Sequence, residues 1–252
     1  MKYIVLSFDD GSKSFYTHAL PILKKYNLQS VVNIVTDKPE SNPTAYLTWD
    51  EIRECTRHGV EIANHSSDHT NTLESIVRGA RKIKEQLGTT EAPGFASPRS
   101  GICQKNFDAY RSLLNSGDVA YIRSGNQLKR DGYFRCLLYL IYKHTGFKNV
   151  FYWYNLPNII LPNRKTNELF PSVTCNNDNT TKQLIHFVQK MPDNSSCIIM
   201  LHHIFSKDDI GYKKEKWSNT CEDFEVLCDF LSKNKSIAVI SHKKLCETLA
   251  NS

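Results

Sequence analysis

The sequence lacks any Cys-x-x-Cys pair, although it contains eight cysteines spread over 252 residues. This spacing argues against paired-thiolate zinc sites and against the disulfide framework of small secreted domains. We therefore expect mostly reduced, buried thiols, and the even count leaves one or two disulfides possible. Scattered cysteines of this kind are typical of a reducing compartment.

Long hydrophobic runs are also missing. The longest apolar stretch, "CLLYLIY" at 136–142, is far too short to span a bilayer. The N-terminal "MKYIVLSFDD" has no full apolar region before its first acidic residue, so no signal peptide is visible. We expect a cytoplasmic location, while a leader removed from the chain stays an alternative.

The sequence also lacks a cluster of charges of one sign. Lys and Arg number 32 against 26 Asp and Glu, which gives a net charge of +6 without an arginine-rich arm. Nucleic acid is therefore not indicated as a partner, whereas weak attraction to anionic substrates or peripheral contact with a membrane surface is allowed. These features do not determine the oligomeric state.

Short apolar runs alternate with helical patterns, and this alternation predicts an α/β fold with a mainly parallel sheet. Hydrophobic residues make up 40% of the chain and charged residues 23%, as in a globular domain. The series favours either a barrel or an open doubly wound sheet. The expected strands are 3–8, 30–35, 60–65, 94–98, 119–124, 196–201 and 236–241, and the expected helices are 16–27, 48–59, 72–88, 105–115, 180–191 and 221–233.

We expect one domain over residues 1–252, with an irregular, aromatic-rich insertion near 126–180 that breaks this rhythm. Within it, "FRCLLYLIYKHTGF" at 134–147 is interpreted as a buried helix, with docking on a membrane as the alternative. Trp153 and its aromatic neighbours could stack on a sugar, although such clusters are more often part of a core.

Two adjacent carboxylates follow the first expected strand, in Ser7-Phe8-Asp9-Asp10-Gly11. Neighbouring negative charges repel, so the pair suggests two different roles or a positive ion between them. The sheet rim at which parallel strands end is where α/β proteins place their active sites.

Histidines follow two other expected strands. His65 and His69 are spaced at i and i+4, which suits two imidazoles on one divalent ion, although such a pair alone is often only structural. Two histidines with one carboxylate form a facial metal triad with open positions. His202 and His203 end the strand 196–201, and we expect one of them to be functional.

These segments resemble the polysaccharide deacetylases of the NodB-homology type, carbohydrate esterase family 4. The family motif T-F-D-D-G is similar to residues 7–11, H-[ST]-x-x-H matches residues 65–69, and a final Leu-His matches Leu201-His202. The resemblance implies a distorted (β/α) barrel of seven or eight strands. It also implies a metal-dependent hydrolase that removes N-acetyl groups from a sugar in a polysaccharide, an oligosaccharide or a lipid-linked glycan, so the expected partner is an N-acetylated glycan or glycolipid.

By this resemblance, Asp10, His65 and His69 bind one divalent metal ion, with zinc the first choice and cobalt, nickel, iron and manganese the alternatives. Asp9 would be the general base. His202 would be the general acid, or His203 if the register is shifted by one residue.

The third family motif, Arg-x-Pro-x-Gly, is altered, because Ala96 stands where its arginine holds the base aspartate. We expect Arg123, at the end of the next strand, to reach Asp9 instead. Pro98 and Arg99 are expected to contact substrate, and a backbone N–H within residues 97–101 to help hold the reaction's oxyanion. The alternatives are a deformylase or deacetylase of another small amide, and a catalytically inactive glycan-binding domain of NodB type.

Overall fold

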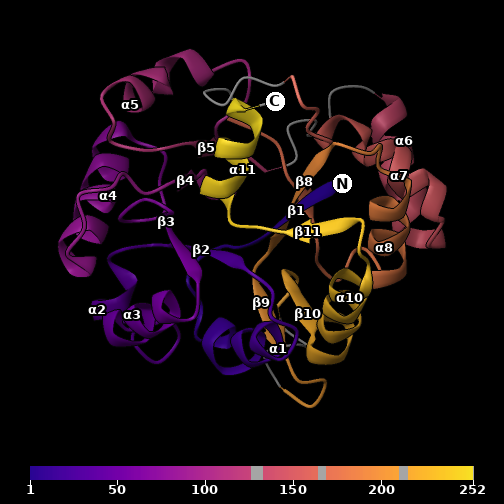
Figure 1. Cartoon of the computed structure of the whole chain (residues 1–252), viewed down its shortest axis with the longest axis horizontal. Helices are drawn as coiled ribbons and strands as arrows, with labels where there is room; N and C mark the ends of the chain where they lie inside the picture. The colour runs from indigo at the N-terminus through magenta and orange to yellow at the C-terminus, as the bar shows by residue number, and fades with distance from the viewer. Residues whose placement is uncertain (126–132, 164–168, 210–214, 252) are drawn as a thin grey trace.

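The computed structural model describes residues 1–125, 133–163, 169–209 and 215–251, without the side chains of residues 134 and 135. Parallel strands form a central sheet, and helices surround it as a ring (Figure 1). The strands of this sheet are β1 (Lys2–Phe8), β2 (Ser30–Ile34), β3 (Val60–Asn64), β4 (Phe95–Ala96), β5 (Ile122–Arg123), β6 (Leu169–Phe170), β7 (Val173–Thr174), β8 (Ser196–Leu201) and β11 (Ile237–Val239).

A second, two-stranded sheet pairs β9 (His203–Phe205) with β10 (Ser218–Thr220). The longer helices are α3 (Trp49–Arg57), α4 (Leu73–Leu87), α6 (Tyr133–Thr145), α7 (Lys148–Asn155), α8 (Thr181–Lys190), α10 (Cys221–Lys233) and α11 (His242–Ala250). The shorter ones are η1 (Phe15–Ala19), α1 (Leu20–Lys25), α2 (Lys38–Ser41), η2 (Pro98–Ser100), η3 (Phe107–Tyr110), α5 (Arg111–Asn115) and η4 (Leu156–Asn158).

The sheet closes on itself through one segment, residues 169–174. Its first part, β6, pairs with β5, and its second part, β7, pairs with β8. The remaining order is β5-β4-β3-β2-β1-β8. If residues 169–174 count as one strand, seven strands complete the ring. The expected fold, a distorted (β/α) barrel of seven or eight strands, is therefore confirmed.

The distortion lies at β1. One edge of this strand pairs with β8 over residues 3–8, whereas the other edge is shared between β11 at residues 2–4 and β2 at residues 7–8. Two neighbours on one edge splay the barrel open at its N-terminal end. The C-terminal end of β1 stays between β2 and β8, and this is the rim that carries the aspartates.

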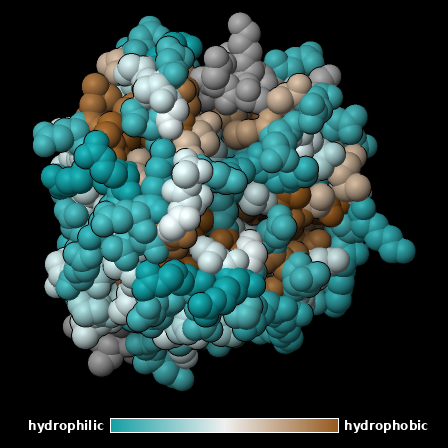
Figure 2. Space-filling view, turned by 60° about the vertical axis from the view of Figure 1, so that its left-hand side comes forward, coloured by the Kyte–Doolittle hydropathy of each residue, from teal (hydrophilic) through white to brown (hydrophobic). Residues whose placement is uncertain are grey.

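Strong local signals explain the helices that were predicted correctly. A capping box begins α3, in which Thr48 and Glu51 exchange hydrogen bonds between side chain and backbone. Thr72 caps α4, and Gly88 ends it with a φ of +62° that favours glycine. The outer faces of such amphipathic helices are polar. Figure 2 brings the α4 side forward, and most of the visible face is hydrophilic, with hydrophobic side chains only in separate areas.

The expectation of an irregular segment near 126–180 is wrong for residues 133–158, which contain α6, α7 and η4. Tyr142 and Phe151 pack edge-to-face with ring centroids 5.1 Å apart and join the main core. The helical period was hidden by aromatic residues that fall on both faces. The parts of the expected insertion at 126–132 and 164–168 lie outside the described residues.

The helix expected at 134–147 is present as α6, but it is only half-buried. Tyr142 faces the core, whereas Leu137 and Leu140 are 52% and 51% exposed. In the described part of the chain, no helix combines the length and apolar character needed to cross a membrane. All eight cysteines are free thiols, and four of them are buried.

The closing segment makes a testable contribution to stability. Phe170 on β6 is fully buried, and we expect Phe170→Ala to lower the free energy of unfolding by about 3–5 kcal/mol because it opens a cavity at the barrel closure. Urea denaturation measures this loss. Phe147→Ala is the matched control, since that side chain is 60% exposed. An equal effect of the two substitutions would contradict the assigned packing.

Candidate active site

The candidate site lies where β1, β3 and β8 end. Asp9 and Asp10 follow β1, His65 follows β3, and His202 follows β8. Backbone hydrogen bonds extend the ladder past these ends: the Asp9 N–H donates to the Leu201 carbonyl at 2.8 Å. Because all three strands run parallel, their terminal side chains gather on one rim.

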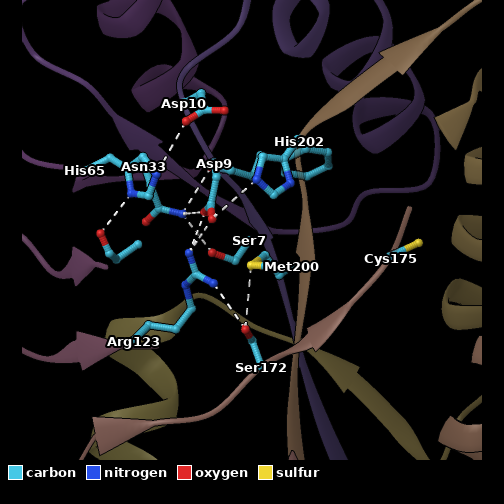
Figure 3. A network of polar contacts seen from close by, with 12 residues as sticks. Ser7, Asp9, Asp10, Asn33, His65, Arg123, Ser172, Cys175, Met200 and His202 are labelled. Carbon is cyan, nitrogen blue, oxygen red and sulfur yellow. Dashed lines mark hydrogen bonds and ion pairs between the residues drawn. The ribbon is translucent and has the colours of Figure 1, made fainter. Parts of the chain in front are cut away.

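Left-handed backbone turns shape this rim. Asp10, Ser66 and His69 have φ values of +72°, +64° and +66°, a region that non-glycine residues rarely occupy. Gly11 follows at +67°, where a Cβ would lie 2.8 Å from the Ile34 side chain. Such strain concentrates at functional sites. Here the turn after Asp9 directs the two adjacent aspartates to different partners (Figure 3).

Asp10 faces both histidines of the expected metal triad. The Nε2 atoms of His65 and His69 lie 3.4 and 3.3 Å from Asp10 Oδ1, and one ligand atom from each residue lies within 4.8 Å of the others. The His65 Nδ1 is 2.8 Å from the Ala96 carbonyl. This bond assigns a proton to Nδ1 and directs Nε2 toward Asp10, the orientation seen in metal-bound histidines. The three residues therefore fit a divalent cation.

The charges at the triad support this arrangement. Burial raises the pKa of Asp10, but hydrogen bonds from His65 and His69 outweigh it, so the pKa lies below its ordinary value. Burial lowers the pKa of His65, and the carboxylates of Asp9 and Asp10 outweigh that effect and raise it. The site thus holds an ionised carboxylate beside two imidazoles.

Asp9 points away from the triad and meets Arg123 (Figure 3). The Arg123 Nη2 donates to both Asp9 oxygens at 2.5 and 2.7 Å, and Asn33 Nδ2 donates to Oδ1 at 2.8 Å. The expected contact is present, and both charged side chains are almost fully buried. Burial raises the pKa of Asp9, while the charges of Arg123, His65 and His202 hold it below its ordinary value.

The guanidinium is held in turn by the segment that closes the barrel. Arg123 Nη1 donates to Ser172 Oγ at 3.2 Å, and that hydroxyl donates to the Ser124 carbonyl at 2.9 Å. Ser172 lies between β6 and β7. The closure of the sheet therefore places the partner of Asp9.

His202 lies on the other side of Asp9, with its Nε2 3.9 Å from Asp9 Oδ2. Its ring is 5.1 Å from that of Trp217, and its burial lowers its pKa. His203 instead lies on β9 and stacks on Phe205 at 5.3 Å. Of the two candidates for the general acid, the described contacts bring His202 to Asp9.

The loop after β4 contributes less than expected. The N–H groups of Ser97, Ser100 and Gly101 donate to carbonyls within the fold, so they are not offered to an oxyanion. Pro98 is buried, and its carbonyl accepts from Asn71 and Gly101. Arg99 is exposed at a φ of +52°. Substrate contacts by Pro98 and Arg99 stay predictions.

The aromatic side chain beside His202 is Trp217, which the sequence interpretation missed. Trp217 follows a charged stretch and precedes a three-residue strand, so no periodic signal marks it. Trp153 lies on α7 with 56% of its surface exposed. Its expected role in sugar stacking stays a prediction.

Comparisons with known proteins agree with this geometry. The family model described as polysaccharide deacetylase matches residues 1–108. The predicted resemblance to this family is confirmed. The matched region contains both aspartates, Asn33 and the two histidines of the triad.

Two curated relatives are named as deacetylases. YxkH of Bacillus subtilis (strain 168), named as a polysaccharide deacetylase, is 31% identical over 138 residues, which cover 40% of this chain and 49% of that protein. The poly-beta-1,6-N-acetyl-D-glucosamine N-deacetylase of Escherichia coli (strain K12) is 30% identical over 93 residues, 31% of this chain and 14% of that protein. The chain thus spans half or less of the relatives it matches.

Solved structures support the fold over the whole chain. The Xyl-CE4 domain of a multidomain xylanase, from the hindgut metagenome of Trinervitermes trinervoides, aligns with a TM-score of 0.55 at 16% identity. The alignment covers 99% of this chain and 91% of that domain. At this identity, the likeness concerns the fold alone.

The triad can be tested by its metal content. We expect the native protein to bind one divalent ion and His69→Ala to lose most of it, because two remaining ligands make a poor site. Elemental analysis after zinc loading and desalting gives the stoichiometry. His58→Ala is the control, since His58 follows α3 on the surface. Full metal content in His69→Ala would refute the assignment.

The buried ion pair predicts strong coupling between its members. Arg123→Met leaves the Asp9 carboxylate buried without its cation, and we expect a loss of about 3–5 kcal/mol in the free energy of unfolding at pH 7. The double variant Arg123→Met/Asp9→Asn should lose clearly less than the sum of the single losses. Urea denaturation of all four proteins supplies the cycle. Losses that add within about 0.5 kcal/mol would show no coupling.

Proposed function

We propose that this chain is a metal-dependent hydrolase that removes the N-acetyl group from an N-acetylated sugar. One observation carries the proposal: a buried, ionised Asp9 lies between the charge of Arg123 and the imidazole of His202, next to the Asp10–His65–His69 triad. A base, an acid and a metal-binding group on one rim are the parts that amide hydrolysis requires.

The triad would hold a divalent ion, for which we propose zinc, with cobalt, nickel, iron and manganese as alternatives. When bound, such an ion lowers the pKa of a coordinated water and polarises the carbonyl of an amide. Two imidazoles and one carboxylate leave further positions open for these ligands.

Side chains of the protein carry out the proton transfers. Asp9 accepts the proton of the attacking water, and Arg123 and Asn33 hold its carboxylate in one orientation. His202 takes up this proton and donates it to the leaving amine. The 3.9 Å between Asp9 and His202 exceeds a hydrogen bond, and we expect the two groups to approach each other when substrate is bound.

The substrate class rests on the relatives. One of them is named for poly-beta-1,6-N-acetyl-D-glucosamine, and the family for polysaccharides. We therefore propose an N-acetylated glycan as the partner. The test measures acetate release from chito-oligosaccharides, poly-N-acetylglucosamine and simple N-acetylglucosamine glycosides, before and after metal removal with a chelator. Release of formate from N-formyl sugars alone would identify a deformylase, and glycan binding without release would identify an inactive domain.

The division of roles between the aspartates gives a sharper prediction. We expect Asp9→Asn to keep the metal and to reduce kcat by about 10²–10⁴-fold, the usual contribution of a general base. Asp10→Asn should lose metal as well as activity, because it removes a ligand. Acetate release and metal content are measured on the same preparations. Equal metal loss in both variants would show that the roles are assigned wrongly.

A further inference from the structure

A cavity of about 460 Å³ lies beside the candidate site. Its walls come from α6, from α7, from the chain that follows β7, and from Trp217 before β10. Trp217 contributes to both the cavity and the candidate site, because it lines the cavity and its ring centroid lies 5.1 Å from that of His202. The chain after β7 is tied to the rim by the Cys175 N–H, which donates to the Met200 carbonyl at 2.8 Å. Trp217 therefore joins the wall of the cavity to the candidate site.

The cavity walls are largely aromatic and aliphatic. They include Tyr139, Leu140, Tyr142, Phe151 and Tyr154, in addition to Trp217. The volume falls in the usual range for small-molecule sites. An apolar group that enters would be removed from water on several sides at once, which is worth about 0.8 kcal/mol per buried methylene.

Several polar groups of the cavity are already engaged. Asp178 accepts from Tyr139 Oη at 2.9 Å and pairs with Lys143 at 2.9 Å and Lys216 at 3.3 Å. Asp178 is thus paired on both oxygens, and the two lysines exceed its charge by one, which disfavours a cationic ligand.

The amides of the cavity bond to one another or to the backbone. Asn155 donates to the Phe151 carbonyl and accepts from Asn158, and Asn179 donates to the Thr174 carbonyl. The Asn179 Oδ1 has no partner among the described residues, but it is sealed from solvent. A sugar ring needs free donors and acceptors, so an apolar occupant fits these walls better.

Apolar side chains are also exposed along the two helices that line the cavity. Leu137 and Leu140 on α6, Phe147 between the helices and Trp153 on α7 are each more than half exposed. The face in Figure 2 differs, because its hydrophobic side chains are scattered among hydrophilic ones. An apolar approach to the cavity therefore exists on the α6–α7 side.

We propose that this cavity binds the apolar aglycone of a glycolipid substrate, while the N-acetylated sugar joined to it lies at Asp9. The proposal rests on the proposed deacetylase function and names its substrate class. Trp217 lines the cavity and also lies beside His202. The aglycone would therefore lie in the cavity and the sugar at the rim.

The first experiment compares the methyl and octyl glycosides of N-acetylglucosamine, both kept below micelle-forming concentrations. We expect the native zinc-loaded protein to release acetate from the octyl glycoside with a kcat/KM about tenfold higher. Leu140→Asn should remove most of this preference and leave the methyl glycoside unchanged. Leu137→Asn is the matched control, since Leu137 is equally exposed on the same helix but does not line the cavity.

The second experiment separates this proposal from the deacetylase function. Octyl glucoside, which has no N-acetyl group, is titrated against the protein, and tryptophan fluorescence reports binding. We expect saturable binding in the native protein and in Leu137→Asn, a several-fold weaker affinity in Leu140→Asn, and a smaller fluorescence change in Trp217→Phe. If no N-acetylated compound releases acetate but this binding pattern holds, the proposed function fails and the cavity assignment stands.

Two results would overturn the cavity assignment. One is equal kcat/KM for the methyl and octyl glycosides together with no saturable binding of octyl glucoside. The other is an equal loss of octyl preference in Leu137→Asn and Leu140→Asn, which would assign the effect to adsorption on the apolar surface of α6.

Discussion

The site depends on one buried ion pair, between Asp9 and Arg123. Removal of two charges from water costs free energy, and the structure offsets this cost with short bidentate contacts and further hydrogen bonds. The supporting groups come from separate parts of the chain: Asn33 on β2 and Ser172 between β6 and β7. The carboxylate can therefore be held in this way only when the whole barrel is closed, so the geometry of the candidate site and global folding are linked.

Backbone strain separates the two adjacent carboxylates. The left-handed conformation of Asp10, followed by Gly11, turns the chain sharply after β1. Asp9 is left in the buried network with Arg123, while Asp10 faces the histidines at the rim. Two neighbouring residues of the same type thus acquire different surroundings, one suited to proton transfer and the other to metal binding.

Sequence prediction succeeded where local signals were strong and failed where they were weak. The strand expected at 196–201 has the same bounds in the structure, and the capped helices differ by one or two residues. The closing segment at 169–174 was missed, because its two strands have two residues each and show no period. The helix at 133–145 was expected at 134–147, whereas the helix at 148–155 was missed because its aromatic residues obscured the amphipathic pattern.

The sequence by itself determined which side chains lie at the rim: which strands end in carboxylates and histidines, and that Ala96 stands where the family motif has an arginine. These features are local, because they need only the order of residues along one strand and its turn. Only the tertiary structure decided which partners meet. It brings Arg123 to Asp9 across the barrel, places His202 rather than His203 beside Asp9, and brings Trp217 next to His202. Such contacts join residues far apart in the chain, and their positions follow from the closure of the sheet and from packing, which no local pattern encodes.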